Sequence, residues 1–381
     1  MTTKRRYDLD WLRVISVFAV FLHHVFMPFN GDEFHIMNSE SSKLLDDVMV
    51  YFEQFRLPLL FFVSGVGTVF AFSKRNWKEF IIERSKRLLI PLFFGVAILI
   101  PPQTYFENYR SYGAYISEYP QLLIKLKVNH LWFIENLFLL SLFLIPIILF
   151  FRSRNSEVLK SFIKKVTSKY GFIIWCLTLV VIRVITKYYF PEDDKSFMNP
   201  STTLYFGFFF ISGIIISSTT ELWELLLKNR RKNLLYLILS SVLFYFYYFI
   251  PREYISPYFS LATRWSIWYV VCSLVSWSAI ITILGYGQKL LNKGSELLKK
   301  LNEAVYPFYM LHQTVIIILG YFILQFQVSI TAKIIILMIS SFLSIVILYL
   351  AIIYPFSWVR FLFGMKNNQP KTSKSADENS F

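Results

Sequence analysis

The sequence predicts an all-α, polytopic integral membrane protein with about ten transmembrane helices. Three observations support this prediction. Of the 381 residues, 55% are hydrophobic and 19% are aromatic, which is unusual for a water-soluble domain. Apolar runs of about 18 residues or more recur along the chain, and that length matches the hydrocarbon core of a bilayer. The basic residues gather in short segments between these runs.

The hydropathy pattern divides the chain into one membrane domain and one tail. We place a single membrane-embedded domain at residues 1–355, with no separate soluble domain. We expect the polar tail at 356–381 to be disordered, because its final stretch, KNNQPKTSKSADENSF, is polar and poor in aromatic residues. The predicted spans are about 9–29, 47–72, 88–106, 131–151, 171–190, 202–220, 234–250, 264–286, 305–326 and 331–354.

The charges of the connecting segments alternate along the chain. Six segments on the side of the N-terminus hold 27 of the 39 Lys and Arg residues, whereas the opposite loops hold far fewer. By the positive-inside rule this asymmetry places both termini in the cytoplasm and favours an even number of spans. The formal charge of +15 therefore reflects topology and contacts with anionic lipids, not nucleic-acid binding. The first apolar run lacks a small-residue cleavage site, so we expect it to remain as the first helix.

The first span contains ionisable residues that are costly inside a membrane. Arg13 and His24 are eleven residues apart, about three helical turns and 16 Å, so both lie on one stripe of the helix. Asp10 lies three residues before Arg13, within pairing reach. Ionisable groups at this depth usually face a bundle interior and mark functional sites. The spacing therefore predicts a site on this face of the helix.

His24 is the candidate general base of that site. A neutral imidazole suits the deprotonation of a hydroxyl group at physiological pH. The alternative is a structural histidine that hydrogen-bonds a neighbouring helix. His23 is the second choice, because it lies about 100° further round the helix and leaves the stripe of Arg13.

The second span contains a patch of small residues, Ser64, Gly65 and Gly67. Small residues let helix backbones approach closely, so one interpretation is tight helix packing. The other is close approach of a substrate, with Ser64 as a hydrogen-bond donor. Arg56 lies near the outer end of this span and is assigned to the substrate side, with Glu53 three residues earlier as its predicted partner.

The inner segment before the third span carries the strongest cluster of charge. Arg84 and Arg87 are three residues apart, and Lys86 lies beside them. Arg binds phosphate through two parallel hydrogen bonds, so the cluster suits a phosphorylated donor such as a nucleotide or coenzyme A. The alternative is an ordinary positive-inside cluster. No Walker or Rossmann glycine motif accompanies it, so ATP hydrolysis and dinucleotide binding have no support.

The outer end of the fourth span is a candidate for substrate contact. We expect His130, Trp132, Glu135 and Asn136 to form one polar and aromatic rim there. His35, in the first outer loop, is assigned to the same role. Tyr, Asn, Asp and Glu in such loops stack on sugars and bind their hydroxyls, although the aromatic residues also populate any membrane interface.

The ninth span opens from the inside with Pro307, which would kink the helix or cap its start. Tyr309 and His312 follow about one turn apart and are assigned to substrate contact, although His312 alone is more typical of a structural histidine. The five histidines are scattered along the sequence without an H-x-x-x-H pattern, so no metal site is predicted. Cys176 and Cys272 lie in apolar runs and are expected to be packing residues.

Several of these fragments resemble, in the same order, the motifs of the membrane-bound acyltransferase-3 family. That family carries an Arg, ten residues and then a His in its first helix, which Arg13 and His24 match. Its second-helix Ser-Gly motif is similar to Ser64-Gly65, and its R-x-x-R signature is similar to Arg84–Arg87. HLWFIENLF and VYPFYMLHQTV resemble its later signatures. The resemblance covers almost the whole chain and looks nearest to the glucan succinyltransferase branch.

The resemblance implies O-acyl transfer in the bacterial cytoplasmic (inner) membrane. The donor would be a cytoplasmic acyl-coenzyme A, acetyl-CoA or succinyl-CoA, and the acceptor a hydroxyl of an extracytoplasmic glycan or glycolipid. His24 would be the catalytic base, and Arg13 would hold the donor or the developing charge near it. Asp10, the pairing partner of Arg13, is assigned to the same catalytic set. Ser64 would shape the site, and the phosphates of the donor would bind Arg84, Lys86 and Arg87. Direct transfer is favoured over an acyl-enzyme on Ser64 or His24, because it needs no second activated nucleophile.

Two other classes of function are compatible with parts of the pattern. A transporter or flippase for a glycolipid or small solute would also have about ten helices and a buried Arg–His stripe. It predicts broken helices at corresponding positions of two halves, and the helix-breaking residues here show no such pairing. A non-catalytic scaffold or sensor is the third class, and it would tolerate replacement of Arg13, His24, Arg84 and Arg87.

Overall fold

The computed structural model describes residues 5–124 and 127–366. Within these ranges the regular secondary structure is entirely helical. Nine helices of the described part are long and apolar enough to cross a membrane, or ten if the bent pair Tyr115–Phe143 and Ile145–Arg152 counts as one span. The predicted all-α, polytopic architecture with about ten spans is confirmed.

The long helices follow the predicted spans, although α16 begins well before the predicted residue 305. Their bounds are α1 (Tyr7–Asn30), α2 (Lys43–Phe72), α10 (Trp175–Tyr189), α11 (Pro200–Ser217), α13 (Arg230–Phe249), α15 (Leu261–Leu290), α16 (Glu296–Ile323) and α17 (Ile330–Leu348). The third span consists of α3 (Trp77–Arg84), α4 (Ile90–Phe94) and α5 (Ile100–Glu107). The shorter helices are α6 (Tyr115–Ile124), α7 (Trp132–Phe143), α8 (Ile145–Arg152), α9 (Glu157–Tyr170), α12 (Thr220–Lys228), α14 (Arg252–Ile255) and α18 (Ser357–Leu362).

Short turns of other helix types connect or extend these helices. π-helical turns at Ser85–Leu89 and Gly95–Leu99 join the pieces of the third span, and a third one at Tyr349–Ile353 extends α17. Single 3-10 turns occupy Tyr109–Ser111, Asn129–Leu131, Arg154–Ser156 and Phe172–Ile174.

The third span begins earlier than predicted. α3 starts at Trp77 and not near residue 88, because Asn76 and Glu79 form a reciprocal capping box. The Asn76 side chain accepts from the Glu79 N–H at 2.9 Å, and the Glu79 carboxylate accepts from the Asn76 N–H at 3.1 Å. The charged segment that the sequence placed in a loop is therefore helical and continuous with the span.

Two prolines lie within or at the start of helices of the later spans. α16 begins at Glu296 with Ser295 as its cap, so Pro307 lies inside the helix and does not cap its start. The fourth span is broken between α7 and α8, where Pro146 has no N–H to continue the helical hydrogen bonds.

The predicted tail at 356–381 starts with ordered structure. α18 packs back on the bundle, and its Arg360 forms an ion pair with Glu303 of α16 at 2.5 Å. The disorder predicted for the tail is therefore wrong for α18. Residues 367–381 lie outside the described ranges.

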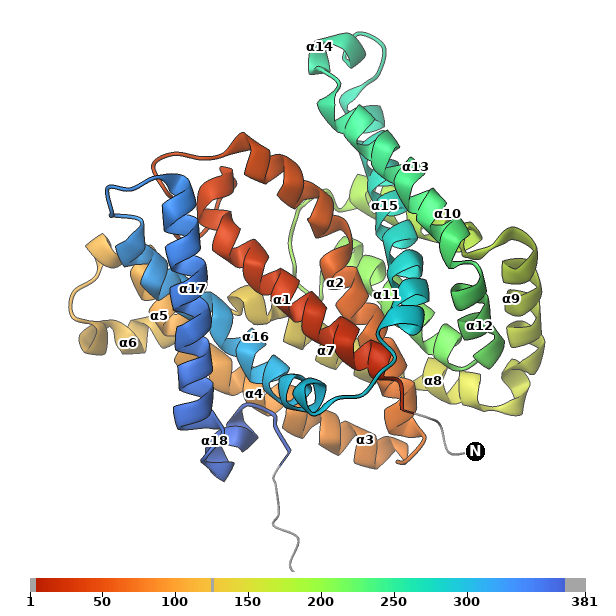
Figure 1. Ribbon diagram of the computed structural model, residues 1–381, viewed down its shortest axis with the longest axis horizontal. Coiled ribbons are helices and arrows are strands. Elements are labelled where there is room, and N and C mark those ends of the chain that lie inside the picture. Colours follow the sequence, from red (N-terminus) through yellow and green to blue (C-terminus); the bar gives the residue numbers. More distant parts are fainter. Residues whose placement is uncertain (1–4, 125–126, 367–381) are drawn as a thin grey trace, which may run out of the picture.

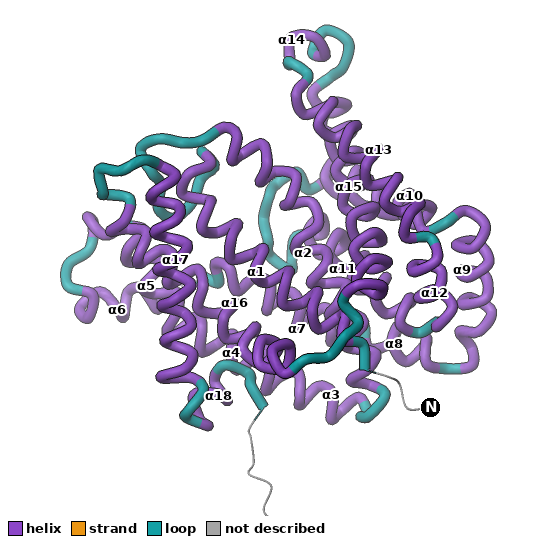
Figure 2. Tube along the Cα trace, in the orientation of Figure 1, coloured by secondary structure: helices purple, strands orange, loops and turns teal. Residues whose placement is uncertain are grey.

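Helices α1, α2, α11 and α16 pack together at the centre of the bundle. α10, α13 and α17 expose most of their side chains, as helices that face lipid do. α13 and α15 pair along their length and project beyond the rest of the bundle at the end that carries α14 (Figure 1). The start of α1, α3 and α18 lie at the opposite end, as the trace in Figure 2 also shows.

α2 and α11 approach each other at two glycines. A Cβ atom at Gly65 would lie 2.1 Å from the carbonyl oxygen of Phe210, and one at Gly213 would lie 2.3 Å from that of Phe62. Gly65 therefore serves close helix packing, the first interpretation of the small-residue patch. Gly67 faces α1 instead, because a Cβ atom there would lie 3.9 Å from Nη2 of Arg13.

We expect Gly65→Ala to destabilise the bundle by about 1–3 kcal/mol, as overpacking of a core does. The added methyl group would collide with a backbone carbonyl, which has no rotamer by which to move away. The measurement is the thermal unfolding midpoint of the detergent-purified protein.

Gly207→Ala on α11 is the matched control. The nearest atom to its new methyl group would be Cδ2 of Leu140 at 3.7 Å, an ordinary contact. Equal midpoints for the two variants would contradict the packing role of Gly65.

Candidate active site

Helix α1 carries two groups of polar contacts at different depths. Arg13 marks the first and His24 the second, about 16 Å apart along the helix axis. The arginine cluster consists of Asp10, Arg13, Thr68, Arg84, Arg87 and Asn302. The histidine cluster consists of His23, His24, His35, His130 and His312.

Arg13 is held by groups from two helices. Its Nη1 donates to Oδ1 of Asn302 in α16 at 3.0 Å and lies 3.7 Å from Oδ1 of Asp10. The predicted pairing of Asp10 with Arg13 is thereby confirmed. Asp10 also pairs with Arg5 at 2.9 Å, so its negative charge is shared between two guanidinium groups.

Arg84 reaches from the third span to α2. Its Nη2 donates to the hydroxyl of Thr68 at 2.8 Å, and that hydroxyl donates to the carbonyl of Ser64 at 2.8 Å. Its guanidinium carbon lies 5.0 Å from the centroid of the Phe80 ring. These contacts join the R-x-x-R segment to the Ser-Gly segment of α2.

Arg87 completes a positive region between α1 and the third span. Its Nε lies 3.2 Å from Oε1 of Glu83, one turn earlier. Arg13, Arg84 and Arg87 lie close enough to repel one another electrostatically. All three are partly buried, whereas Lys86 is exposed. Three guanidinium groups in one region suit an anion with several negative charges.

His24 and His312 face each other across α1 and α16. Nε2 of His312 lies 3.2 Å from Nδ1 of His24, and the ring centroids are 4.9 Å apart. The ring of His130 lies 5.1 Å from that of His312, and the ring of His23 lies 5.5 Å from that of His24. Four imidazoles therefore form a continuous row through the bundle.

His35 joins this row through two amide side chains. Nε2 of Gln313 donates to Nε2 of His35 at 2.9 Å, while Nδ1 of His35 donates to the Glu107 carboxylate at 2.8 Å. Gln313 also donates to Oε1 of Gln103 at 3.2 Å, and Nε2 of Gln103 lies 3.4 Å from Nδ1 of His130. All five histidines, scattered in the sequence, thus meet in one network.

Gln103 is the hub of this network, and sequence reasoning missed it. Its fully buried amide also donates to the hydroxyl of Thr314 at 2.8 Å and accepts from Asn129 at 3.0 Å. A signal was present, because Gln103 and the pair Gln313 and Thr314 are polar residues inside apolar runs. Such residues at membrane depth need partners.

The predicted rim of the fourth span is not one surface. His130 is buried in the histidine cluster, whereas Asn136 donates to the carbonyl of Lys195 at 3.0 Å. Trp132 packs against aromatic rings of α2 and α11, and Glu135 is partly exposed. The prediction of a single rim is wrong because the helical turn directs these side chains toward different neighbours.

Tyr309 supports two histidines of the row. Its hydroxyl donates to the carbonyl of His130 at 2.5 Å, and its own carbonyl accepts from Nδ1 of His312. His312 is 1% exposed, so it is enclosed by protein groups.

The row reaches the protein surface through Glu53. Oε1 of Glu53 lies 3.4 Å from Nε2 of His23 and 3.4 Å from Nη2 of Arg56, which confirms the predicted Glu53–Arg56 pair. The side chain of Glu53 is 41% exposed, whereas that of His23 is 8% exposed. Glu53 therefore connects the buried imidazoles with the outside of the bundle.

No group of three or more His, Cys, Asp or Glu side chains within the described ranges is arranged to hold a metal ion. The contacts of the imidazole nitrogens are with carbonyls, amides, the carboxylates of Glu53 and Glu107, and one another. Cys176 and Cys272 are free and buried, as packing residues are.

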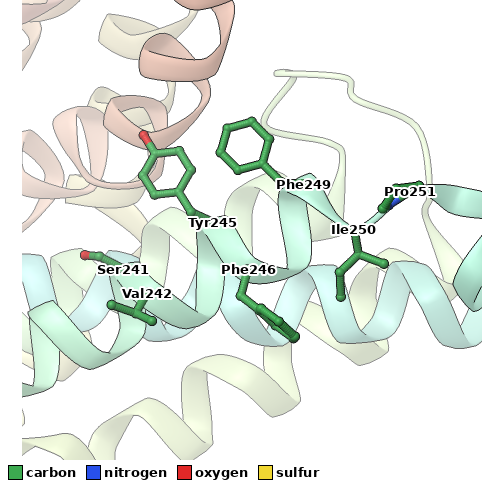
Figure 3. Close-up of a pocket in the computed structure, with 7 residues that line it drawn as sticks. All are labelled: Ser241, Val242, Tyr245, Phe246, Phe249, Ile250 and Pro251. Carbon is green, nitrogen blue, oxygen red and sulfur yellow. The ribbon is translucent and has the colours of Figure 1, made fainter.

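A hollow on α13 shares no residue with either cluster. It is lined by Ser241, Val242, Tyr245, Phe246, Phe249, Ile250 and Pro251 (Figure 3). The ring of Tyr245 points toward α2, where its hydroxyl donates to the carbonyl of Asp47 at 3.1 Å. Phe246 is 66% exposed. This apolar lining suits lipid chains better than a polar substrate.

Comparison with known proteins decides the family. A family model for the acyltransferase domain matches residues 6–359. The chain belongs to the acyltransferase-3 family. Arg13, His24, Ser64-Gly65 and Arg84–Arg87 all lie in the matched region of this membrane acyltransferase.

Individual proteins are also similar to this acyltransferase. Glucans biosynthesis protein C of Salmonella paratyphi B and of Salmonella heidelberg are each 25% identical to it over 159 residues, which is 40% of this chain. The chain spans 41% of the length of each of these relatives. No solved structure matches it.

We expect Gln103→Leu to lower the free energy of unfolding by at least about 2 kcal/mol. The apolar side chain would remove the acceptor of the partly buried Asn129 amide and one of the two acceptors of the buried Gln313 amide, and an unsatisfied buried group costs about 1–3 kcal/mol. The unfolding midpoint of purified protein measures this effect.

Gln325→Leu is the control, because Gln325 is exposed just after α16 and its side-chain amide donates to the nearby carbonyl of Tyr321. Its midpoint should stay close to that of the unchanged protein. A Gln103→Leu variant as stable as this control would contradict the hub role of Gln103.

Proposed function

We propose that this acyltransferase moves an acyl group, acetyl or succinyl, from cytoplasmic acyl-coenzyme A to a hydroxyl of an extracytoplasmic glycan or glycolipid. The observation that carries the proposal is the placement of the arginine cluster and the histidine cluster about 16 Å apart on one helix. The positive-inside distribution of charge supports an orientation with the arginine cluster toward the cytoplasm and both termini on that side. The membrane would be the bacterial cytoplasmic (inner) membrane.

The donor would bind at the arginine cluster. Arg84 and Arg87 are directed into one region with Arg13, and guanidinium groups bind phosphates tightly. Lys86 is exposed, so it would reach a phosphate only from the solvent side. Arg13, at this depth, would hold the donor and not the charge that develops near His24, with Asp10 as its partner. Ser64 would line the passage between the clusters, because it shares the face of Gly67 that is turned toward Arg13.

The acceptor would enter beside Glu53, where the histidine row reaches the surface. Three side chains toward the same end of the bundle would contact the acceptor: His35, Arg56 and Glu135. Four residues would lie further from the surface: His130, Trp132, Asn136 and Tyr309. The name of the Salmonella relatives, glucans biosynthesis protein C, favours a glucan as acceptor.

The chemistry needs one base at the meeting point of the two substrates. Nε2 of His24 takes the proton of the acceptor hydroxyl while its oxygen bonds to the thioester carbon. The carbon–sulfur bond then breaks, and the coenzyme A thiolate receives the proton from His24. Direct transfer of this kind needs no acyl-enzyme on Ser64 or His24.

We expect His24→Ala to lower the transfer rate by about 10²–10⁴-fold, the usual contribution of a general base. The assay is the transfer of labelled acetyl or succinyl groups from acyl-coenzyme A to glucan oligosaccharides by purified protein. Gel filtration and the unfolding midpoint show whether the variant is folded. A folded His24→Ala variant with full transfer activity would refute the proposal.

We expect Arg84→Gln and Arg87→Gln to lower kcat/KM for acyl-coenzyme A by about tenfold or more each, because hydrogen bonds to charged groups contribute about 1.5–3 kcal/mol. With an acyl-pantetheine donor, which lacks the phosphates, the variants and the unchanged protein should be alike. Kinetics with both donors make this comparison.

Lys78→Ala is the matched control for these two variants. It removes one positive charge from α3, where Lys78 is exposed and lies over the Trp77 ring. A loss equal to that of the arginine variants would indicate a general effect of charge and not phosphate binding.

A further inference from the structure

We propose that His312 is a positioning residue that holds His24 with Nδ1 protonated and Nε2 free to act as the base. The inference rests on the proposed function of His24 and extends it to a second helix. Its basis is the set of hydrogen-bond partners around the two rings, which come from α1 and α16.

The partners of His312 determine which of its nitrogens carries the proton. Nδ1 faces the carbonyl of Tyr309, and a carbonyl can only accept a hydrogen bond, so Nδ1 is the donor. A neutral imidazole has one N–H, so Nε2 presents a lone pair. That nitrogen lies 3.2 Å from Nδ1 of His24. The ring is held in place by its neighbour His130, at a centroid distance of 5.1 Å.

The partners of His24 complete the assignment. Its Nδ1 lies 2.9 Å from the carbonyl of Val20 and 3.2 Å from Nε2 of His312, and both are acceptors. The proton of His24 therefore resides on Nδ1, which leaves the lone pair on Nε2. Val20 belongs to the same helix as His24. His312 is the acceptor that ties the orientation of the ring to the neighbouring helix.

This arrangement has a role at the moment of transfer. When Nε2 of His24 takes the acceptor proton, the ring becomes an imidazolium whose Nδ1–H still donates to Nε2 of His312. The lone pair of His312 stabilises that charge, as a hydrogen-bonded partner does for a catalytic histidine. His24 then returns the proton to the leaving thiolate and becomes neutral again. His312 neither gains nor loses a proton in the cycle.

Two substitutions at one position separate this role from a structural one. The amide of Gln in His312→Gln reaches the place of Nε2 and offers an acceptor to His24, whereas the shorter amide in His312→Asn reaches only the place of Nδ1. We expect kcat within about tenfold of the unchanged enzyme for His312→Gln and at least about a hundredfold lower for His312→Asn. KM for both substrates should change less than about threefold, because no substrate contact is removed.

The assay measures thiol release from acetyl-CoA or succinyl-CoA with glucan oligosaccharides as acceptor. Equal kcat values for the two folded variants would overturn the positioning role, provided that His24→Ala is inactive. An active His24→Ala variant would instead overturn the proposed function itself.

A second measurement reads the protonation states in the unchanged enzyme and uses the substituted proteins only to assign the signals. The ¹⁵N NMR spectrum of histidine-labelled enzyme distinguishes imidazoles protonated at Nδ1 from those protonated at Nε2. The signals of His24 are assigned by their loss in His24→Ala, and those of His312 by their loss in His312→Gln. We expect both residues to be neutral and protonated at Nδ1 in the unchanged enzyme. A His312 protonated at Nε2 would overturn the proposal.

Discussion

Hydrogen-bond satisfaction inside the membrane is the constraint on which this structure depends. The hydrocarbon core offers no partner to an imidazole, an amide or a guanidinium group, so each must find one in the protein. The histidine cluster meets this requirement with amides and backbone carbonyls that link α1, the third span and α16. In the arginine cluster, Arg13 and Arg84 donate to neutral groups, Asn302 and Thr68, and their positive charge is only partly compensated. The same constraint thus produces a network of imidazoles and amides at one depth and a positively charged cluster at the other.

Helix α2 brings the two clusters into one assembly. Gly65 allows its backbone to contact α11, while the adjacent face carries Gly67 and Thr68 against Arg13 and Arg84. Near its other end, Glu53 contacts His23. A single helix therefore touches both clusters, and its close packing on α11 restricts how far either cluster can shift. Packing and polar contacts are coupled in this way. A substitution at Gly65 would therefore shift the polar contacts of α2 as well as its contact with α11.

The features that could be predicted from the sequence are those that depend on neighbours along the chain. Hydropathy located the spans, and i,i+3 spacing located the Asp10–Arg13 and Glu53–Arg56 pairs. The His24–His312 contact joins residues 288 positions apart and depends on how α1 and α16 pack, which no local pattern encodes. Gln103 is recognisable in the sequence as a polar residue in an apolar run, but its partners Thr314 and Gln313 are distant in the sequence, so its central place in the network could not be predicted. The early start of α3 was missed because its capping box lies within a run of charges that hydropathy assigns to a loop.

The straight run of α1 between Arg13 and His24 has a consequence for substrate choice. No Pro or Gly interrupts residues 13–24, and Pro28 lies beyond them, so this part of α1 is stiff. In the proposed function, a donor anchored by its phosphates near Arg13 would present its reactive carbon at a fixed distance, close to 16 Å by helical rise. Under that proposal, α1 would select donors by the length between their phosphates and their thioester. The size of the acyl group would be limited by the walls of the site instead.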